Sequence, residues 1–233
     1  MRAAYFDCLS GVSGDMILGC LFDVGFRVDV FKKGMEDLGI EFKRFELKDV
    51  VRGGIRAKSV SFELIKKDFE GSYQDITSLI TESNLSEYVK EKALRCFDLL
   101  AEAESRIHMT PKEEVHFHEL GSLDTIADVV GSFLGLESLD IQEISCSPIT
   151  LGTGMIHSEH GRLPVPSPAT IEILSGVPVR GSGVDMELAT PTGVAILKAA
   201  TLTFGHLPLM RVEGVGYGAG SREIDNFPNV LRL

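Results

Sequence analysis

Segments typical of strands and segments typical of helices alternate along this 233-residue chain, and that alternation constrains its fold most. The apolar stretch at residues 2–7 is expected to be a buried strand. Alternating or short apolar runs predict a hairpin at 41–65 and strands at 115–118 and 143–149. Helical spacing predicts helices at 16–24, at 28–38, from Ser72, at 86–107 and at 122–136. Interleaved strands and helices favour an α/β or α+β architecture, a mixed sheet with flanking helices.

The remaining third of the chain is punctuated by glycine and proline. Residues 152–168, dense in Gly, His and Pro, are expected to be a loop. A short helix is predicted at 168–174, a strand at 177–180, a helix from Thr190 to about 202, and a last strand at 229–233. A chain of this length fits one compact unit, 1–233, in which 41–110 form an inserted subdomain.

Charge and cysteine usage exclude several classes of protein. The net charge is −11, and no cluster of Lys and Arg is present to neutralise phosphates, so nucleic-acid binding is not expected. The four cysteines are far apart and form no CxxC pair, which argues against a disulfide framework and favours a cytoplasmic location. No uncharged apolar run approaches the ~20 residues that span a bilayer, so no membrane association is expected.

Four of the six histidines fall into two tight clusters, which indicates a metal site. On a strand, His116 and His118 point the same way, about 7 Å apart at their Cα atoms, with Glu119 beside them. The second pair is His157 and His160. Imidazoles together with carboxylates suit Ni, Zn, Fe or Mn. The alternatives are packing for the first pair and a solvated turn for the second.

Two aspartates extend the predicted metal site. Asp124 and Asp128 are four residues apart on the next helix and therefore share a face. They are expected to ligate the ion or to hold the ring N–H groups of ligating histidines. Asp124 could equally be a first-turn acid that complements the helix dipole. Asp128 lies among apolar residues, where a carboxylate usually has a partner.

The segment from Asp7 to Asp15 is the second candidate site. Its small residues Ser10, Gly11, Ser13 and Gly14 stand between a strand and a helix, where backbone N–H groups can bind a phosphate or another anion. Asp7 could hold a divalent ion, and Asp15 could cap the helix or ligate. A tight strand-to-helix turn is the structural alternative.

Two further segments are candidates for ligand binding. Thr190, Thr192 and Gly193 stand at a helix start that suits an anion, although simple capping explains them almost as well. Tyr217, among glycines, could bring its ring against a flat ligand, or lie in a flexible loop. Arg222 could clamp a carboxylate or phosphate.

These motifs together resemble the LarC family of nickel-insertion proteins. The resemblance covers the chain in the family's order, through the strings at residues 5–16, 115–121, 163–169, 190–193, 216–220 and 228–231. It implies a CTP-dependent nickel chelatase of the lyase class. Such an enzyme inserts Ni²⁺ into pyridinium-3,5-bisthiocarboxylic acid mononucleotide, forming the nickel-pincer cofactor of lactate racemase, and Mn²⁺ or Mg²⁺ assists the CTP step.

The resemblance also implies roles for the candidate residues. The histidines would deliver nickel, and a helix start would hold the substrate's phosphate. Asp7, Asp15 or His118 would accept the proton released when the pyridinium carbon is metallated.

The chain departs from the family at two places. Residues 65–71 lack the histidine-rich tract that members commonly carry there. Typical members also continue into a second domain associated with CTP binding, so we expect a first-half polypeptide that acts with a separate C-terminal half, as a homo-oligomer. The alternatives from other classes are a non-catalytic nickel metallochaperone and a phosphohydrolase that uses Asp7 with magnesium.

Overall fold

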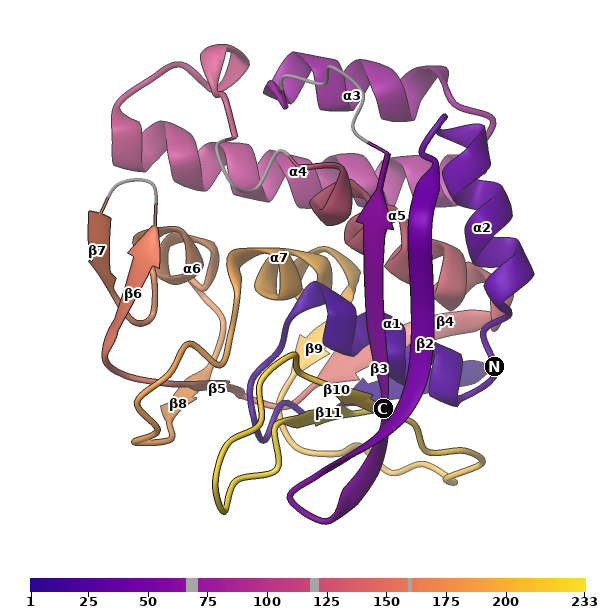
Figure 1. Cartoon of the computed structure of the whole chain (residues 1–233), viewed down its shortest axis with the longest axis vertical. Helices are drawn as coiled ribbons and strands as arrows, with labels where there is room; N and C mark the ends of the chain where they lie inside the picture. Colours follow the sequence, from indigo (N-terminus) through magenta and orange to yellow (C-terminus); the bar gives the residue numbers. More distant parts are fainter. Residues whose placement is uncertain (66–70, 118–121, 159–160) are drawn as a thin grey trace.

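The structure is a computed structural model that describes residues 1–65, 71–117, 122–158 and 161–233 (Figure 1). Its first sheet has the order β1-β4-β9 and is parallel. The strands are β1 (Arg2–Phe6), β4 (Ile141–Cys146) and β9 (Thr203–Phe204). Parallel neighbours require long crossover connections, and helices supply them here. The predicted α/β class is confirmed.

The second sheet joins the central hairpin to the end of the chain. Its order is β11-β10-β3-β2, with β2 (Phe42–Arg52), β3 (Ile55–Leu64), β10 (Tyr217–Ala219) and β11 (Val230–Arg232). The predicted hairpin at 41–65 is confirmed by the antiparallel pairing of β2 with β3. A bridge between Asp7 and Arg232 connects this sheet to the end of β1.

Most of the helix starts agree with the capping residues in the sequence. The helices are α1 (Gly14–Asp23), α2 (Val28–Asp37), α3 (Tyr73–Glu82), α4 (Glu87–His108), α5 (Leu123–Ser138), α6 (Pro168–Ile173) and α7 (Pro191–Ala200), with the short 3₁₀ helix η1 (Lys112–Glu114). Side chains cap five of them, each accepting a hydrogen bond from the amide three residues on: Ser72, Ser86, Ser122, Ser167 and Thr190. Each such cap stabilises its helix by about 1 kcal/mol.

Helix α1 lies at the centre of the core, because it contacts β3 and β10 on one side and α5 and α7 on others (Figure 1). Its residues Ile17, Leu18 and Leu21 are fully buried. Burial of each such side chain contributes about 1.5–3 kcal/mol. This helix therefore joins the second sheet to the helical layer.

The structure differs from the sequence-based expectation at two places. Residues 152–168 contain a hairpin, β6 (Met155–Ser158) with β7 (Gly161–Pro164), rather than only a loop. Conversely, within the described part of 115–118 only an isolated bridge from His116 to Ser72 forms. Cross-strand partners decide both outcomes, and local composition does not reveal them.

The rest of the topology bears on domain organisation. β5 (Ile149–Leu151) pairs with β8 (Val179–Gly181). Within 41–110, β3 pairs with β10 and α4 packs against α5, α6 and α7, so both parts of that segment contact the rest of the chain. The inserted subdomain stays a prediction. Among the described residues, no helix combines the length and apolar character needed to cross a membrane.

Candidate functional site

Three helices, α1, α5 and α7, begin close together. Thr190, the cap of α7, donates its backbone N–H to the carbonyl of Val12 at 3.0 Å. A Cβ added to Gly193 would lie 2.6 Å from the Cα of Ser13, so only glycine lets the first turn of α7 approach the start of α1. The carboxyl group of Asp128, on α5, lies against Gly14 in the same way. We call this region the helix junction.

Acidic side chains from two of these helices meet at the helix junction. Asp15 accepts hydrogen bonds from the Ser13 hydroxyl and from the Met16 amide, the latter at 2.9 Å. Asp128 is half-buried, and its buried Oδ1 has no hydrogen-bond partner among the described residues. Asp124 lies one helical turn before Asp128. A buried carboxylate oxygen without a hydrogen-bond partner is unfavourable unless it binds a proton or a ligand.

Burial shifts the pKa of all three acids upward. The pKa of Asp128 is raised well above its ordinary value by burial and by the neighbouring charges of Asp15 and Asp124. The pKa of Asp15 is raised by burial, although its hydrogen bonds from Ser13 and Met16 oppose the shift. Burial also raises the pKa of Asp124. Carboxyl groups shifted toward neutral pH are suited to exchanging protons with a substrate.

These carboxyl groups limit what the predicted anion loop can bind. Ser10 and Gly11 are buried, and Ser13 and Gly14 form the start of α1. The amino end of α1 already has Asp15 in its first turn and Asp128 against Gly14. A phosphate there would face two like charges unless they are protonated or joined to it by a cation. The phosphate role of this loop stays a prediction.

Asp7 has a partner of its own. Its carboxylate accepts from the guanidinium of Arg232, and its backbone N–H donates to the Arg232 carbonyl at 2.8 Å. Asp7 is 9% exposed. These contacts hold β11 to the end of β1, which is a structural task. A role of Asp7 in proton transfer or ion binding stays a prediction.

His116 and His157, one from each histidine cluster, lie at the surface. His116 is exposed between Val115 and Phe117, which are buried, and His157 is exposed on β6, opposite Arg162. His118, Glu119 and His160 lie outside the described residues. Within the described ranges, no three His, Cys, Asp or Glu side chains are grouped so that they could hold a metal ion. The predicted ligand set therefore stays a prediction.

The glycines around Tyr217 have a packing role that the sequence did not reveal. A Cβ on Gly218 would collide with the carbonyl group of Met16, so these glycines let β10 lie directly on α1. The Tyr217 amide donates to Asp23 Oδ2 at 3.0 Å. Arg222 is exposed, and its carbonyl accepts from Asn229. Ligand contacts of Tyr217, Arg222 and Thr192 stay predictions.

A polar cluster near His116 was missed in the sequence. Asp98 on α4 accepts hydrogen bonds from Tyr73 and Lys112. The signal was present, because Asp98 lies between the apolar residues Phe97 and Leu99, as Asp128 lies among apolar neighbours.

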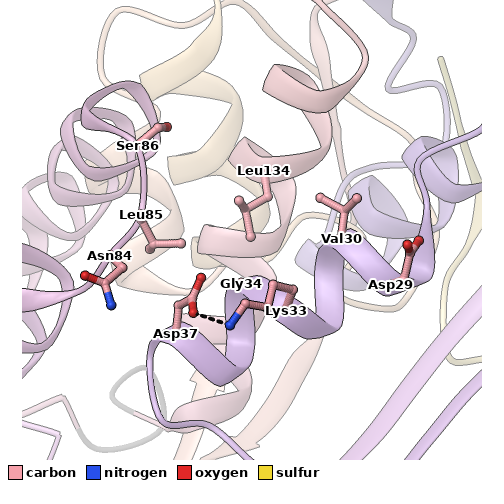
Figure 2. A pocket seen from close by; sticks show the side chains of 9 residues that line it. All are labelled: Asp29, Val30, Lys33, Gly34, Asp37, Asn84, Leu85, Ser86 and Leu134. Carbon is pink, nitrogen blue, oxygen red and sulfur yellow. Dashed lines mark hydrogen bonds and ion pairs between the residues drawn. The ribbon is translucent and has the colours of Figure 1, made fainter.

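One cavity, of about 360 Å³, lies between α2, the connection from α3 to α4, and the second half of α5 (Figure 2). Leu85 and Leu134 line it together with charged side chains. Lys33 pairs with Asp37 at 2.7 Å, and Ser86 donates to Glu137 at 2.6 Å. Because these polar groups are already paired, the cavity offers no chemistry comparable to the helix junction.

Comparison with known proteins assigns the chain to a known group. The model of a family described as "Nickel insertion protein" matches residues 4–233. A putative nickel insertion protein of Dictyoglomus thermophilum is 43% identical over 233 residues, which are all of this chain and 60% of that protein. No solved structure matches the chain.

Two further relatives are also named as nickel insertion proteins. The pyridinium-3,5-bisthiocarboxylic acid mononucleotide nickel insertion protein of Desulfitobacterium hafniense is 44% identical over 234 residues, 58% of its length. A putative nickel insertion protein of Wolinella succinogenes is 46% identical over 238 residues, 60% of its length. The chain thus spans about 60% of the length of these relatives.

Proposed function

Since the chain belongs to the nickel insertion protein family, we propose that it takes part in inserting Ni²⁺ into pyridinium-3,5-bisthiocarboxylic acid mononucleotide. The single observation that carries this proposal is the match of the family model over residues 4–233. The substrate is the compound in the printed name of the D. hafniense relative. The product would be the nickel-pincer cofactor of lactate racemase, formed by a chelatase of the lyase class.

In this proposal the helix junction accepts the proton that the reaction releases. Forming a nickel–carbon bond at the pyridinium ring replaces a C–H bond, and the proton must pass to a nearby base. Asp15 and Asp128 are the proposed acceptors, because burial raises the pKa of both and so makes their ionised forms stronger bases. Among the residues that the structure describes, Oδ1 of Asp128 has no partner to lose when it takes up the proton.

Nickel is the cargo of this reaction, and the histidines are proposed to deliver it. His116 and His157 are exposed, so an incoming ion can reach them. His118, Glu119 and His160 are proposed to complete the ligand set, and Asp124 to orient or join it. Imidazole and carboxylate donors suit Ni²⁺.

The substrate's phosphate is proposed to bind where α7 starts beside residues 10–14. The hydroxyl groups of Thr190 and Thr192 are the proposed donors there, because the amides of Thr190 and Gly193 already donate to the Val12 carbonyl and the Thr190 hydroxyl. Asp128 would help to hold a Mn²⁺ or Mg²⁺ ion brought with CTP, whose positive charge would offset the like-charge conflict. Magnesium is commonly held by one or two carboxylates together with phosphate oxygens.

The relatives are longer than the matched region, and we propose that the additional sequence supplies CTP binding. It would act on this chain either as a continuation or as a separate polypeptide, in a cytoplasmic homo-oligomer. Because the chain spans only about 60% of the relatives' length, binding of the precursor is a better first test than turnover.

The test is calorimetric titration of the purified chain with Ni²⁺, with the precursor, and with both. The chain alone is expected to bind the precursor. The absorption spectrum is expected to change when nickel is then added with CTP, Mg²⁺ and the additional sequence of the relatives. Asp128→Asn should bind the precursor and yield little spectral change. Nickel binding without precursor binding would refute the proposal and favour a metallochaperone.

A further inference from the structure

Three side chains form a polar cluster between α3, α4 and η1, which we call the Asp98 clamp: Tyr73, Asp98 and Lys112. The Tyr73 hydroxyl donates to Asp98 Oδ1, and Lys112 Nζ donates to the same atom at 2.8 Å. Lys112 Nζ also lies 5.1 Å from the centre of the Tyr73 ring, within cation–π range. The three groups therefore contact one another pairwise.

The electrostatics of the clamp favour its charged form. Burial alone would raise the pKa of Asp98, but the hydrogen bonds from Lys112 and Tyr73 outweigh burial and lower it. The pKa of Lys112 is raised, mainly by its bond to Asp98. Both groups are charged at neutral pH, so the clamp is closed under ordinary conditions.

The clamp and a set of backbone bonds fix the segment that carries His116. The Tyr73 amide donates to the carbonyl of Val115 at 3.0 Å, and the Phe117 amide donates to the carbonyl of Gly71 at 3.2 Å. The ring of Phe117 packs against Phe97 on α4, with ring centroids 6.2 Å apart. Asp98 follows Phe97, so one turn of α4 contacts both ends of the segment 112–117.

The Asp98 clamp contributes little to the stability of the whole fold. The side chains of Asp98 and Lys112 are each 30% exposed, and ion pairs of this kind contribute little to global stability. α3 and α4 already pack side by side through apolar residues such as Ile76, Ile80 and Phe97 (Figure 1). What the clamp adds is the placement of η1, and hence of the backbone leading to His116.

We propose that Asp98, through Tyr73 and Lys112, is a positioning residue that holds His116 where it can ligate nickel. This inference rests on the proposed function. A metal ligand must be held to a fraction of an ångström by groups behind it, and outer partners of metal ligands commonly change affinity 10–100-fold when they are removed. The Asp98 clamp is the described polar network that could serve His116 in this way.

The experiment is a double-mutant cycle between Asp98 and His116 in the full chain. Nickel affinity is measured by competition with a chromophoric chelator for the wild type, Asp98→Asn, His116→Ala and the double variant. Asp98→Glu tests rescue by a longer carboxylate. Glu63→Gln is the control, because it breaks another surface pair, Lys43 with Glu63 at 2.6 Å, within the β2–β3 hairpin.

Asp98→Asn is expected to weaken nickel binding about tenfold in the wild-type background and less than about twofold in the His116→Ala background. Amide hydrogen exchange of Phe117 and Tyr73 should accelerate, while that of the core of α1 stays unchanged. Glu63→Gln should change neither measurement, and Asp98→Glu should recover part of the affinity.

Equal effects of Asp98→Asn in both backgrounds would overturn the inference, because Asp98 would then act without His116. Faster exchange with unchanged nickel affinity would also overturn it and leave the clamp a purely structural feature. A wild-type chain that binds no nickel would refute the proposed function itself, and the inference with it.

Discussion

The helix junction and the histidine-bearing segments are the two regions where chemistry is expected, and they are built in opposite ways. At the helix junction, Gly193 lets the backbones of α7 and α1 approach, and Gly14 leaves space for the Asp128 side chain, so that no added Cβ fits at either position. His116 and His157 instead project from short peripheral segments into solvent. Packing determines the structure of the helix junction, whereas contacts with neighbouring residues hold the histidine-bearing segments.

This difference separates stability from function. A residue at the helix junction serves the fold and the site together, so its substitution changes both. An exposed histidine serves only the site, so its substitution should leave the fold intact. The free energy of unfolding is therefore the measurement that distinguishes the two regions, and five substitutions test it.

The largest effect is expected for Gly193→Ala. The new Cβ would lie 2.6 Å from Ser13 Cα and 2.7 Å from the carbonyl oxygen of Val12, both backbone atoms that cannot rotate away. We expect a loss of about 3 kcal/mol in the free energy of unfolding, measured by urea denaturation. Gly181→Ala is the control, because nothing lies near its Cβ position, and it should change stability by less than about 1 kcal/mol.

The second effect is an increase in the free energy of unfolding. Because the pKa of Asp128 is raised in the folded state, the folded chain binds more protons than the unfolded chain above the unfolded-state value. The free energy of unfolding therefore falls as pH rises through that window. Asp128→Asn removes this loss and should stabilise the chain by about 1–3 kcal/mol at pH 7.

This gain should shrink as pH falls below about 4, where the carboxyl group becomes protonated in the unfolded state as well. Asp225→Asn, an exposed substitution, is the control. If Asp128→Asn destabilised the chain at pH 7, the carboxylate would have a stabilising partner. The helix junction would then differ from the histidine-bearing segments in ligation rather than in packing.

The third effect concerns Asp7. Replacing it with Asn removes a charge-assisted hydrogen bond to Arg232 at a nearly buried position, and should cost about 1–2 kcal/mol by chemical denaturation. Asp29→Asn breaks an exposed pair with Arg27 and should have little effect. Equal effects of the two substitutions would mean that Asp7 is not a structural anchor.

The smallest effect on folding, and the clearest on binding, is expected at the histidines. His116→Ala and His157→Ala should each change the free energy of unfolding by less than about 0.5 kcal/mol, because both side chains are exposed. Each should weaken nickel binding in a chelator competition assay, since each removes a proposed ligand.

Nickel affinity of the wild-type chain should also decline between pH 7.5 and pH 5, because imidazole ligates only when it is deprotonated. Equal affinity at both pH values would argue against histidine ligation. A large loss of stability in either variant, without loss of metal, would assign the histidines to packing and remove the contrast between the two regions.

Much of the architecture could be predicted because its signals are local. Ser72, Ser86 and Ser122 start helices by capping them, and the pattern of residues 41–65 gives the hairpin. The hairpin at β6 and β7 could not be predicted, since its pairing depends on neighbours across the turn. The isolated bridge at His116 likewise depends on Ser72, 44 residues earlier in the chain.

The same distinction between local and long-range signals applies to the candidate site. The sequence by itself determined which groups carry chemistry, because imidazole and carboxylate clusters and the family's motifs are written in residue order. Only the tertiary structure decided which of them meet: it brought Asp128 to Gly14 and bound Asp7 to Arg232. The physical reason is that burial and charge pairing arise between segments far apart in sequence, where no local pattern records them.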